Sequence, residues 1–353
     1  MRIAAVGRGF PRHYYDQETL LAALRTYWEE RYFNLDRLEQ LHRNALVGGR
    51  HLALPLAAYP QLAGFGAAND AWIEVGLEVG ERATRDALAR AGLAPEEIGS
   101  LLFTTVTGVA TPSLDARLAN RLRFRPDLRR LPLFGLGCVA GAAGLARVAD
   151  LLRAWPEEAA LLLSVELCSL TLQREDLSIP NLVASGLFGD GAAAVVLLGE
   201  RHPASARAPG PRIVASRSVF YPDTEGVMGW EVTERGFRVV LSADVPKVVR
   251  EHLRADVDAF LGDLGLDRGR IASWVAHPGG PKVLEALEAA LEIPREALAL
   301  TWRSLGEVGN LSSASVLLVL GDTMAERRPP AGSLGVLLAL GPGFCSELLL
   351  LEW

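Results

Sequence analysis

An internal duplication constrains the fold of this 353-residue chain more than any other feature. Residues 92–104 read GLAPEEIGSLLFT, and residues 265–277, at an offset of 173, read GLDRGRIASWVAH. Each segment combines a Gly-Leu that ends a helix, a short charged turn and an apolar strand. At an offset of 172, Gly137-Cys138 and Gly309-Asn310 each open a helical segment followed by a second apolar strand. A single similarity of this kind can arise by chance between two βα units. Two matched series at a constant offset instead predict two α/β halves of similar topology.

A polar segment rich in Pro and Ala, residues 200–211, separates the two halves, which we place at residues 1–205 and 206–353. The helix expected after Cys138 begins with five small residues, 140–144, so it can pack closely against its counterpart in the second half. Long apolar segments such as 159–167 are typical of strands buried on both faces. The chain is therefore predicted to form an α/β fold, a five-layer α-β-α-β-α sandwich built from two duplicated halves.

Composition and charge exclude several classes of protein. The formal net charge is −6 and no long basic run occurs, which argues against nucleic-acid binding. The three cysteines are too few and too scattered for a disulfide framework, and no CxxC pair indicates a metal site. The apolar part of the N-terminus is too short for a signal peptide, and no apolar stretch reaches membrane-spanning length. We expect a reduced, cytoplasmic protein without a membrane span.

Three residues that can carry chemistry fall at landmarks of the duplication. Cys138 and Asn310 lie at equivalent helix N-termini, and His277 ends the strand before a Gly/Pro turn. The helix macrodipole and a nearby imidazole would both lower the pKa of the Cys138 thiol. His277 and Asn310 could together form an oxyanion hole for a thioester enolate. The pattern predicts a nucleophilic cysteine with two partners that stabilise negative charge.

Each of these residues also has a simpler interpretation. A buried cysteine is usually a small core residue, a single histidine is often structural, and an asparagine after glycine is a common helix cap. The coincidence of all three at duplicated landmarks favours the catalytic interpretation. Cys168, at the end of an apolar strand, is predicted to be a cavity-wall or core residue.

Seven motifs occur in order between residues 135 and 344: GLGCVAGAAGL, SVELCSLT, GLFGDGAAAVVL, FYPDTEGVMGW, AHPGGPKVLEAL, GNLSSAS and ALGPGF. With them the chain resembles, nearly end to end, the type III polyketide synthases, the chalcone-synthase-like members of the thiolase superfamily. The resemblance implies a thiolase-like version of the five-layer fold and a homodimer. It also implies CoA thioesters as substrates, without a cofactor, a metal or a nucleic-acid partner.

The resemblance also implies a mechanism. Cys138 would take an acyl group from a CoA starter, and malonyl-CoA would then lose CO₂ while His277 and Asn310 stabilise the enolate. That enolate would attack the Cys138 thioester in a Claisen condensation, and repeated cycles would give a chain that cyclises in the same cavity. Phe188 matches the family's gatekeeping phenylalanine, which orients the malonyl group. Arg50 and Lys282 are the candidate contacts to CoA.

The expected substrate cavity is lined by Val106, Thr107, Thr111, Cys168 and Val239. Val239 replaces a second gatekeeping phenylalanine of many family members, and Thr111 stands where plant members carry a methionine of the partner subunit. Plant members have threonine and then serine where Val106 and Thr107 stand, and bacterial naphthalene-forming members have cysteine at the Val106 position. Because these side chains form a fairly apolar pocket, we expect a medium- or long-chain fatty acyl starter and an alkylpyrone or alkylresorcinol product.

Other functions remain open from the sequence. One alternative is a tetrahydroxynaphthalene-type synthase that uses malonyl-CoA alone, and another is a ketoacyl-ACP synthase III-like or alkylquinolone-type condensing enzyme. Papain-like cysteine hydrolases have the same order of Cys, His and Asn, but their Cys-Gly-x-Cys-Trp signature is absent here. A non-catalytic scaffold is a further class, against which the intact trio argues.

Overall fold

A computed structural model of the chain describes residues 1–29, 32 and 34–353. Within this part of the chain, nine strands form one mixed sheet in the order β11-β12-β13-β8-β1-β7-β6-β4-β5. Their bounds are β1 (Arg2–Gly9), β4 (Ile98–Thr105), β5 (Arg129–Phe134), β6 (Ala159–Leu167), β7 (Asp190–Leu198), β8 (Arg212–Phe220), β11 (Ile271–Ala276), β12 (Leu334–Gly341) and β13 (Cys345–Glu352).

The sheet consists of two halves that meet where β1 and β8 pair through Arg2 and Arg212. Equivalent elements recur at the predicted offset, because β4 begins at Ile98 and β11 at Ile271, 173 residues later. The predicted duplication is therefore confirmed. The two expected sheets are fused at this one residue pair into a continuous sheet.

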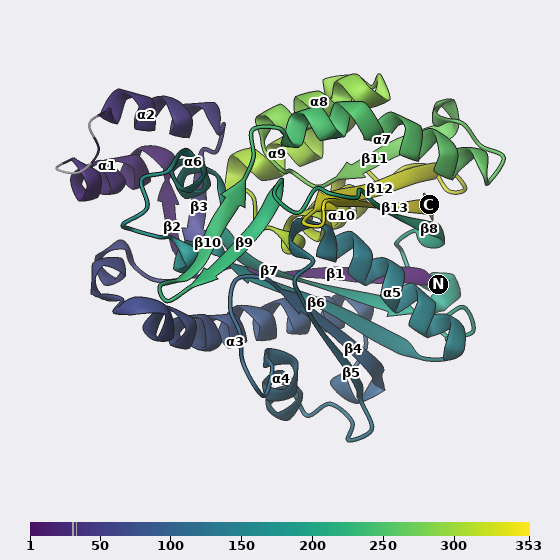
Figure 1. The fold of residues 1–353 in the computed structure, drawn as a ribbon. Helices are drawn as coiled ribbons and strands as arrows, with labels where there is room; N and C mark the ends of the chain where they lie inside the picture. The colour runs from purple at the N-terminus through teal and green to yellow at the C-terminus, as the bar shows by residue number, and fades with distance from the viewer. Residues whose placement is uncertain (30–31, 33) are drawn as a thin grey trace.

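Helices complete the five layers. They are α1 (Gln17–Trp28), α2 (Leu35–Asn44), α3 (Gly64–Ala91), α4 (Leu114–Leu122), α5 (Ala140–Ala154), α6 (Ile179–Leu187), α7 (Val245–Gly262), α8 (Pro281–Leu291), α9 (Ala299–Val308) and α10 (Ser313–Glu326). Helices α5 and α10 lie between the two halves of the sheet, α3 and α4 cover the outer face of one half, and α7 and α8 cover the other (Figure 1).

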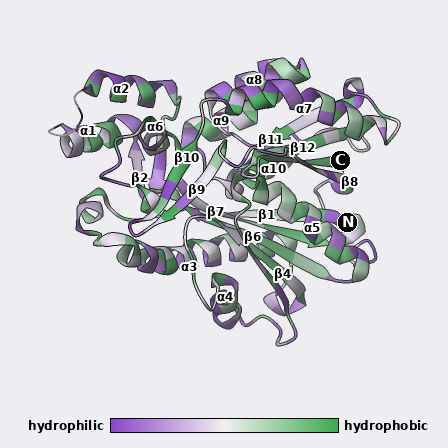
Figure 2. Cartoon of the chain, in the orientation of Figure 1, coloured by the Kyte–Doolittle hydropathy of each residue, from purple (hydrophilic) through white to green (hydrophobic). Residues whose placement is uncertain are grey.

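The contact between α5 and α10 explains the small residues that follow Cys138. Residues 140–146 are all buried, and α10 is buried along most of its length. A Cβ added to Gly141 would lie 2.3 Å from the backbone oxygen of Ser313, so only glycine permits this approach of the two helices. Strands β6 and β7 are buried at every position, which is why their sequences are apolar apart from Ser164, Glu166 and Asp190. Figure 2 shows the same contrast between green central strands and outer helices with purple faces.

Two hairpins stand at one end of the sheet, beside α1, α2 and α6 (Figure 1). One hairpin pairs β2 (His13–Asp16) with β3 (Gly49–Leu52), and the other pairs β9 (Met228–Thr233) with β10 (Gly236–Leu241). Val239 on β10 lies opposite Trp230 on β9. These hairpins supply the walls of the cavities described below.

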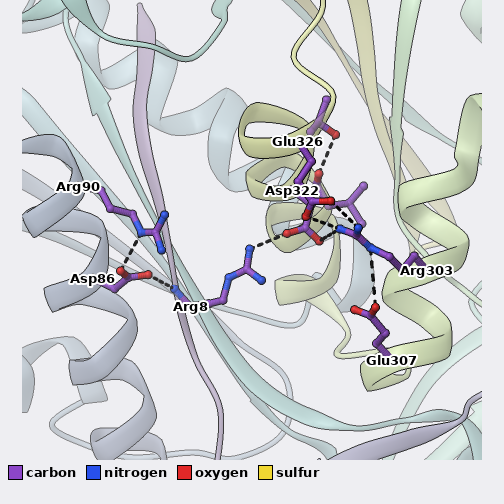
Figure 3. Close-up of polar contacts among 9 residues, drawn as sticks. Arg8, Asp86, Arg90, Arg303, Glu307, Asp322 and Glu326 are labelled. Atoms are coloured by element: carbon purple, nitrogen blue, oxygen red, sulfur yellow. Dashed lines mark hydrogen bonds and ion pairs between the residues drawn. The ribbon is translucent and has the colours of Figure 1, made fainter.

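A cluster of charged side chains fixes α10 to its surroundings on the side away from its N-terminus. Asp322 on α10 pairs with Arg8 on β1 at 2.6 Å and with Arg303 on α9 at 3.4 Å. Arg303 also pairs with Glu326, and the backbone N–H of Arg8 donates to Asp86 on α3 (Figure 3). The cluster connects both halves of the molecule through α10.

Among the helices of the described residues, none combines the length and the apolar character needed to cross a bilayer.

Candidate active site

Cys138 lies in a short 3-10 helix, Gly137–Val139, that leads directly into α5. Gly137 has a φ of +56°, and an added Cβ there would lie 2.6 Å from the ring of Pro342. Glycine is therefore required where this segment contacts the Gly341–Gly343 turn. Cys138 is 6% exposed, and its Sγ lies 3.7 Å from the Oγ of Ser312. The nucleophile candidate is therefore buried at the interface between α5 and α10.

Asn310 lies in the loop between α9 and α10, two residues before Ser312. Its Oδ1 accepts a hydrogen bond from the backbone N–H of Ser312 at 2.8 Å, and its Nδ2 donates to the backbone oxygen of Gly279 at 3.4 Å. Ser312 has a φ of +46°, a strained conformation for a residue with a side chain. This loop holds the amide of Asn310 beside the turn that follows His277.

His277 follows the last residue of β11, and its backbone N–H donates to Leu338 on β12 at 3.0 Å. Among the described residues, neither ring nitrogen has a hydrogen-bond partner. Burial lowers the pKa of His277 to about 3, because no counter-charge offsets the cost of desolvating an imidazolium. The ring is therefore neutral, with one N–H group free to donate to a substrate oxygen.

Burial raises the pKa of the Cys138 thiol to about 12. Hydrogen bonds from Ser312 and Asn310 oppose the shift, and the charge of Glu166 adds to it. The lowered pKa expected from the helix N-terminus and the imidazole is not found in this geometry. Desolvation outweighs both effects, since His277 is neutral and forms no ion pair with the thiol.

A cavity of about 40 Å³ opens beside Cys138. Its walls include Val106, Cys168, Phe188 and Val239, four of the residues that the sequence pointed to, together with Trp230. A second, larger cavity of about 140 Å³ shares Cys168, Phe188, Trp230 and Val239 with the first and extends towards α1 and α6. Phe188 and Val239 therefore stand between the two cavities.

Glu166 on β6 is fully buried next to the site. Its carboxylate accepts hydrogen bonds from the backbone N–H of Val106 at 3.1 Å and from the hydroxyls of Thr107 at 3.0 Å and Ser313. Burial nevertheless raises its pKa to about 7. Cys138 thus has an acid in its surroundings that changes charge near neutral pH.

Comparison with known proteins assigns the family. The family model for chalcone and stilbene synthases, N-terminal domain, matches residues 1–201, and the corresponding C-terminal model matches residues 212–352. The chain belongs to this family. It is an enzyme, a type III polyketide synthase of the bacterial kind, and the predicted thiolase-like fold is confirmed.

Bacterial enzymes are among the named relatives of this synthase. It is 53% identical over 352 residues to 1,3,6,8-tetrahydroxynaphthalene synthase of Streptomyces peucetius, with 99% of this chain and 93% of the relative covered. It is 32% identical to 3,5-dihydroxyphenylacetyl-CoA synthase of Streptomyces toyocaensis, over all of this chain and 90% of that one. The crystal structure of 1,3,6,8-tetrahydroxynaphthalene synthase from Streptomyces coelicolor superposes with a TM-score of 0.94 at 30% identity, covering 100% and 99% of the two chains.

Other predicted residues of the synthase lie outside the Cys138 cavity. Thr107 is buried, but its hydroxyl is engaged by Glu166 and Trp72. Thr111 is exposed on the loop after β4, and Lys282 is exposed in the first turn of α8. Arg50 is 2% exposed and lines the larger cavity, with its guanidinium bound to internal acceptors. The predicted CoA contacts at Arg50 and Lys282 stay predictions.

Three residues of the site were not singled out from the sequence. Glu166 had a signal, since it is the one charged residue in the apolar segment 159–167. Ser312 and Trp230 had none, because the backbone strain of Ser312 and the position of Trp230 at the junction of two cavities arise only from tertiary packing.

Proposed function

We propose that this synthase condenses malonyl-CoA alone and forms 1,3,6,8-tetrahydroxynaphthalene or a close analogue. The observation that carries the proposal is the 53% identity, over 99% of the chain, to the Streptomyces peucetius enzyme of that name. The small volume beside Cys138 also favours it, because about 40 Å³ suits a malonyl-derived starter better than a bulky one. In the proposed reaction the naphthalene ring is assembled from two-carbon units, so malonyl-CoA can supply both the starter and the extender units.

In this proposal Cys138 carries the growing chain as a thioester, and His277 and Asn310 stabilise the enolate that forms when malonyl-CoA loses CO₂. A neutral imidazole N–H and the Nδ2 amide of Asn310 are donors suited to a developing oxyanion. Both groups are buried, which strengthens their hydrogen bonds to a charged oxygen. Phe188, between the two cavities, orients the malonyl group.

Activation of Cys138 requires proton transfer to a base, because its resting form is the neutral thiol. In the proposal, the unpartnered ring of His277 takes this proton as CoA thioester binding changes the surroundings of the pair. The ring passes the proton to the CoA thiolate that leaves when the Cys138 thioester forms, so it is neutral again for decarboxylation. The enzyme acts as a homodimer with CoA thioesters as substrates and without a further cofactor.

A synthase primed by a fatty acyl-CoA, forming an alkylpyrone or alkylresorcinol, is the second candidate. The larger cavity of about 140 Å³ favours it, because many of its lining residues are apolar and it opens from the Cys138 cavity. Val106, in place of the cysteine of naphthalene-forming members, points the same way. The 53% identity to a tetrahydroxynaphthalene synthase favours malonyl-CoA alone, so the expectation of a fatty acyl starter becomes the lesser candidate.

The deciding experiment incubates the purified enzyme with labelled malonyl-CoA, alone and with a panel of medium- and long-chain acyl-CoAs. We expect a naphthol product, identified by mass, from malonyl-CoA alone, with no faster consumption of malonyl-CoA when an acyl-CoA is added. Faster turnover with a fatty acyl-CoA, and a product that retains its alkyl chain, would establish the second candidate instead. A Cys138→Ala variant serves as the control, and its acylation by CoA thioesters would refute the role of Cys138.

A further inference from the structure

Arg50 is a buried cation that forms no ion pair with any residue in the described part of the chain. It lies on β3 and is 2% exposed, and burial lowers its pKa to about 10. Within the described residues no carboxylate lies within 4 Å of its guanidinium, although the charge of Asp190 acts on it from further away. A buried charge of this kind is costly unless other polar groups satisfy its donors.

The donors of Arg50 are used at the C-terminus of α6. Its Nη1 donates to the backbone oxygen of Gly186 at 2.8 Å and to the Oε1 of Gln17 at 2.6 Å, and its Nη2 donates to the backbone oxygen of Ser185. Helix α6 has no basic residue in its own last turn. Arg50 therefore supplies, from another strand, the positive charge that stabilises the negative end of a helix dipole.

Backbone hydrogen bonds at and just after the end of α6 connect the helix to Asn310. Leu187 O accepts from Asn310 N at 2.9 Å, and Gly189 N donates to Asn310 O at 3.0 Å. These two hydrogen bonds enclose Phe188, which forms an isolated parallel β-bridge with Asn310. The end of α6, Phe188 and Asn310 are thus one connected unit of backbone.

Little free space exists around this unit. A Cβ added to Gly189 would lie 2.4 Å from the backbone oxygen of Val308 and 3.1 Å from the Cβ of Arg50. The stem of Arg50 and the end of α9 therefore confine the peptide that follows Phe188 from two sides. We expect a change in the position of the Arg50 side chain to move the end of α6, and with it Phe188 and Asn310.

We propose that Arg50 is a positioning residue that holds the C-terminus of α6, and through it Phe188 and Asn310, in the geometry needed for decarboxylation and condensation. It acts from within the protein instead of binding CoA phosphate. The inference rests on the proposed roles of Phe188 and Asn310, but it does not depend on which product the enzyme makes.

The test compares Arg50→Met and Arg50→Lys with the native enzyme, measuring CO₂ release from carboxyl-labelled malonyl-CoA. This step precedes product formation, so its result is separate from the identity of the product, which the native enzyme reveals. We expect kcat to fall by about 10- to 100-fold in Arg50→Met, with KM for malonyl-CoA changed less than about twofold. Arg50→Lys should recover part of the loss, because an ammonium keeps the charge but not the forked geometry.

Arg268→Met is the matched control. Arg268 donates to Leu291 O at the C-terminus of α8, so it too binds a helix end, but that end does not lead to a residue of the site. We expect this variant to lower Tm while kcat stays native. If Arg50→Met fails to fold, Arg50→Lys and Gln17→Ala carry the test, since Gln17 donates to the same Gly186 oxygen at 3.0 Å.

Two results would overturn the proposal. A large increase in KM with kcat retained would assign Arg50 to CoA binding. A lower Tm with native kcat and KM in the variants that fold would show that Arg50 only stabilises the fold.

Discussion

Replacing Gly141 with alanine tests the close packing of α5 against α10, on which the geometry of Cys138 depends. The added Cβ would lie 2.3 Å from Ser313 O and 2.8 Å from the Cγ1 of Val316, whereas ordinary contacts begin near 3.4 Å. A backbone oxygen cannot rotate away as a side chain can. The helices must therefore separate by roughly 1 Å, and overpacking of this kind costs up to about 3 kcal/mol.

This cost can be converted into a change in Tm. The entropy of unfolding is about 2.1 cal/mol/K per residue, so a chain of 353 residues loses about 4 °C in Tm for ~3 kcal/mol. Activity should fall more steeply than stability, because Ser313 follows Ser312, which contacts both Cys138 and Asn310. A misplacement of about 1 Å in an active site lowers kcat on the order of 100-fold.

Calorimetry and steady-state turnover of malonyl-CoA measure the two effects. Gly66→Ala is the matched control, since Gly66 is an exposed residue near the start of α3 with no atom within 4 Å of an added Cβ, and it should be neutral or slightly stabilising. A Gly141→Ala enzyme with native Tm and native kcat would show that α5 and α10 are not in the close contact described here.

Three further results are expected. Ser312→Ala should slow the alkylation of Cys138 at a fixed, mildly alkaline pH by about tenfold, because the loss of a hydrogen bond that stabilises the thiolate lowers the ionised fraction. Ser313→Ala should slow it less, and peptide mass spectrometry follows the reaction. Burial raises the pKa of Glu166 from 4.5 to about 7, so between these pH values the folded state holds the proton and the unfolded state does not, and stability falls as pH rises. Glu166→Gln should make this decline in Tm less steep. Asp322→Asn should cost about 1 kcal/mol by removing two partly exposed ion pairs, and the difference in Tm should shrink in 1 M salt.

Most of the fold could be predicted from the sequence because the duplication repeats the hydrophobic pattern of whole elements. The duplicated segments predict that β4 and β11 begin at equivalent positions, and the run of small residues predicts that α5 is buried. The fusion of the two halves at Arg2 and Arg212 was not predictable, because it depends on the edges of two sheets meeting in space.

Within the candidate site, the structure brings together several residues that the motifs pointed to, and their roles stay predictions. Val106, Cys168, Phe188 and Val239 do line the cavity at Cys138. Prediction was weaker for electrostatics, since the helix N-terminus suggested a low thiol pKa and burial raises it. Burial is a sum over neighbours from the whole chain, which no local pattern contains.

The sequence by itself determined the duplicated α/β architecture, the nucleophile candidate and the family, because each can be recognised from short motifs and from their order along the chain. Only the tertiary structure decided how Ser312 connects Cys138 with Asn310, and how Arg50 closes the end of α6 beside Phe188. Ser312 and Cys138 are 174 positions apart, and Arg50 and Ser185 are 135 positions apart. Their geometry is set by side-chain packing and desolvation, which exist only once the chain has folded.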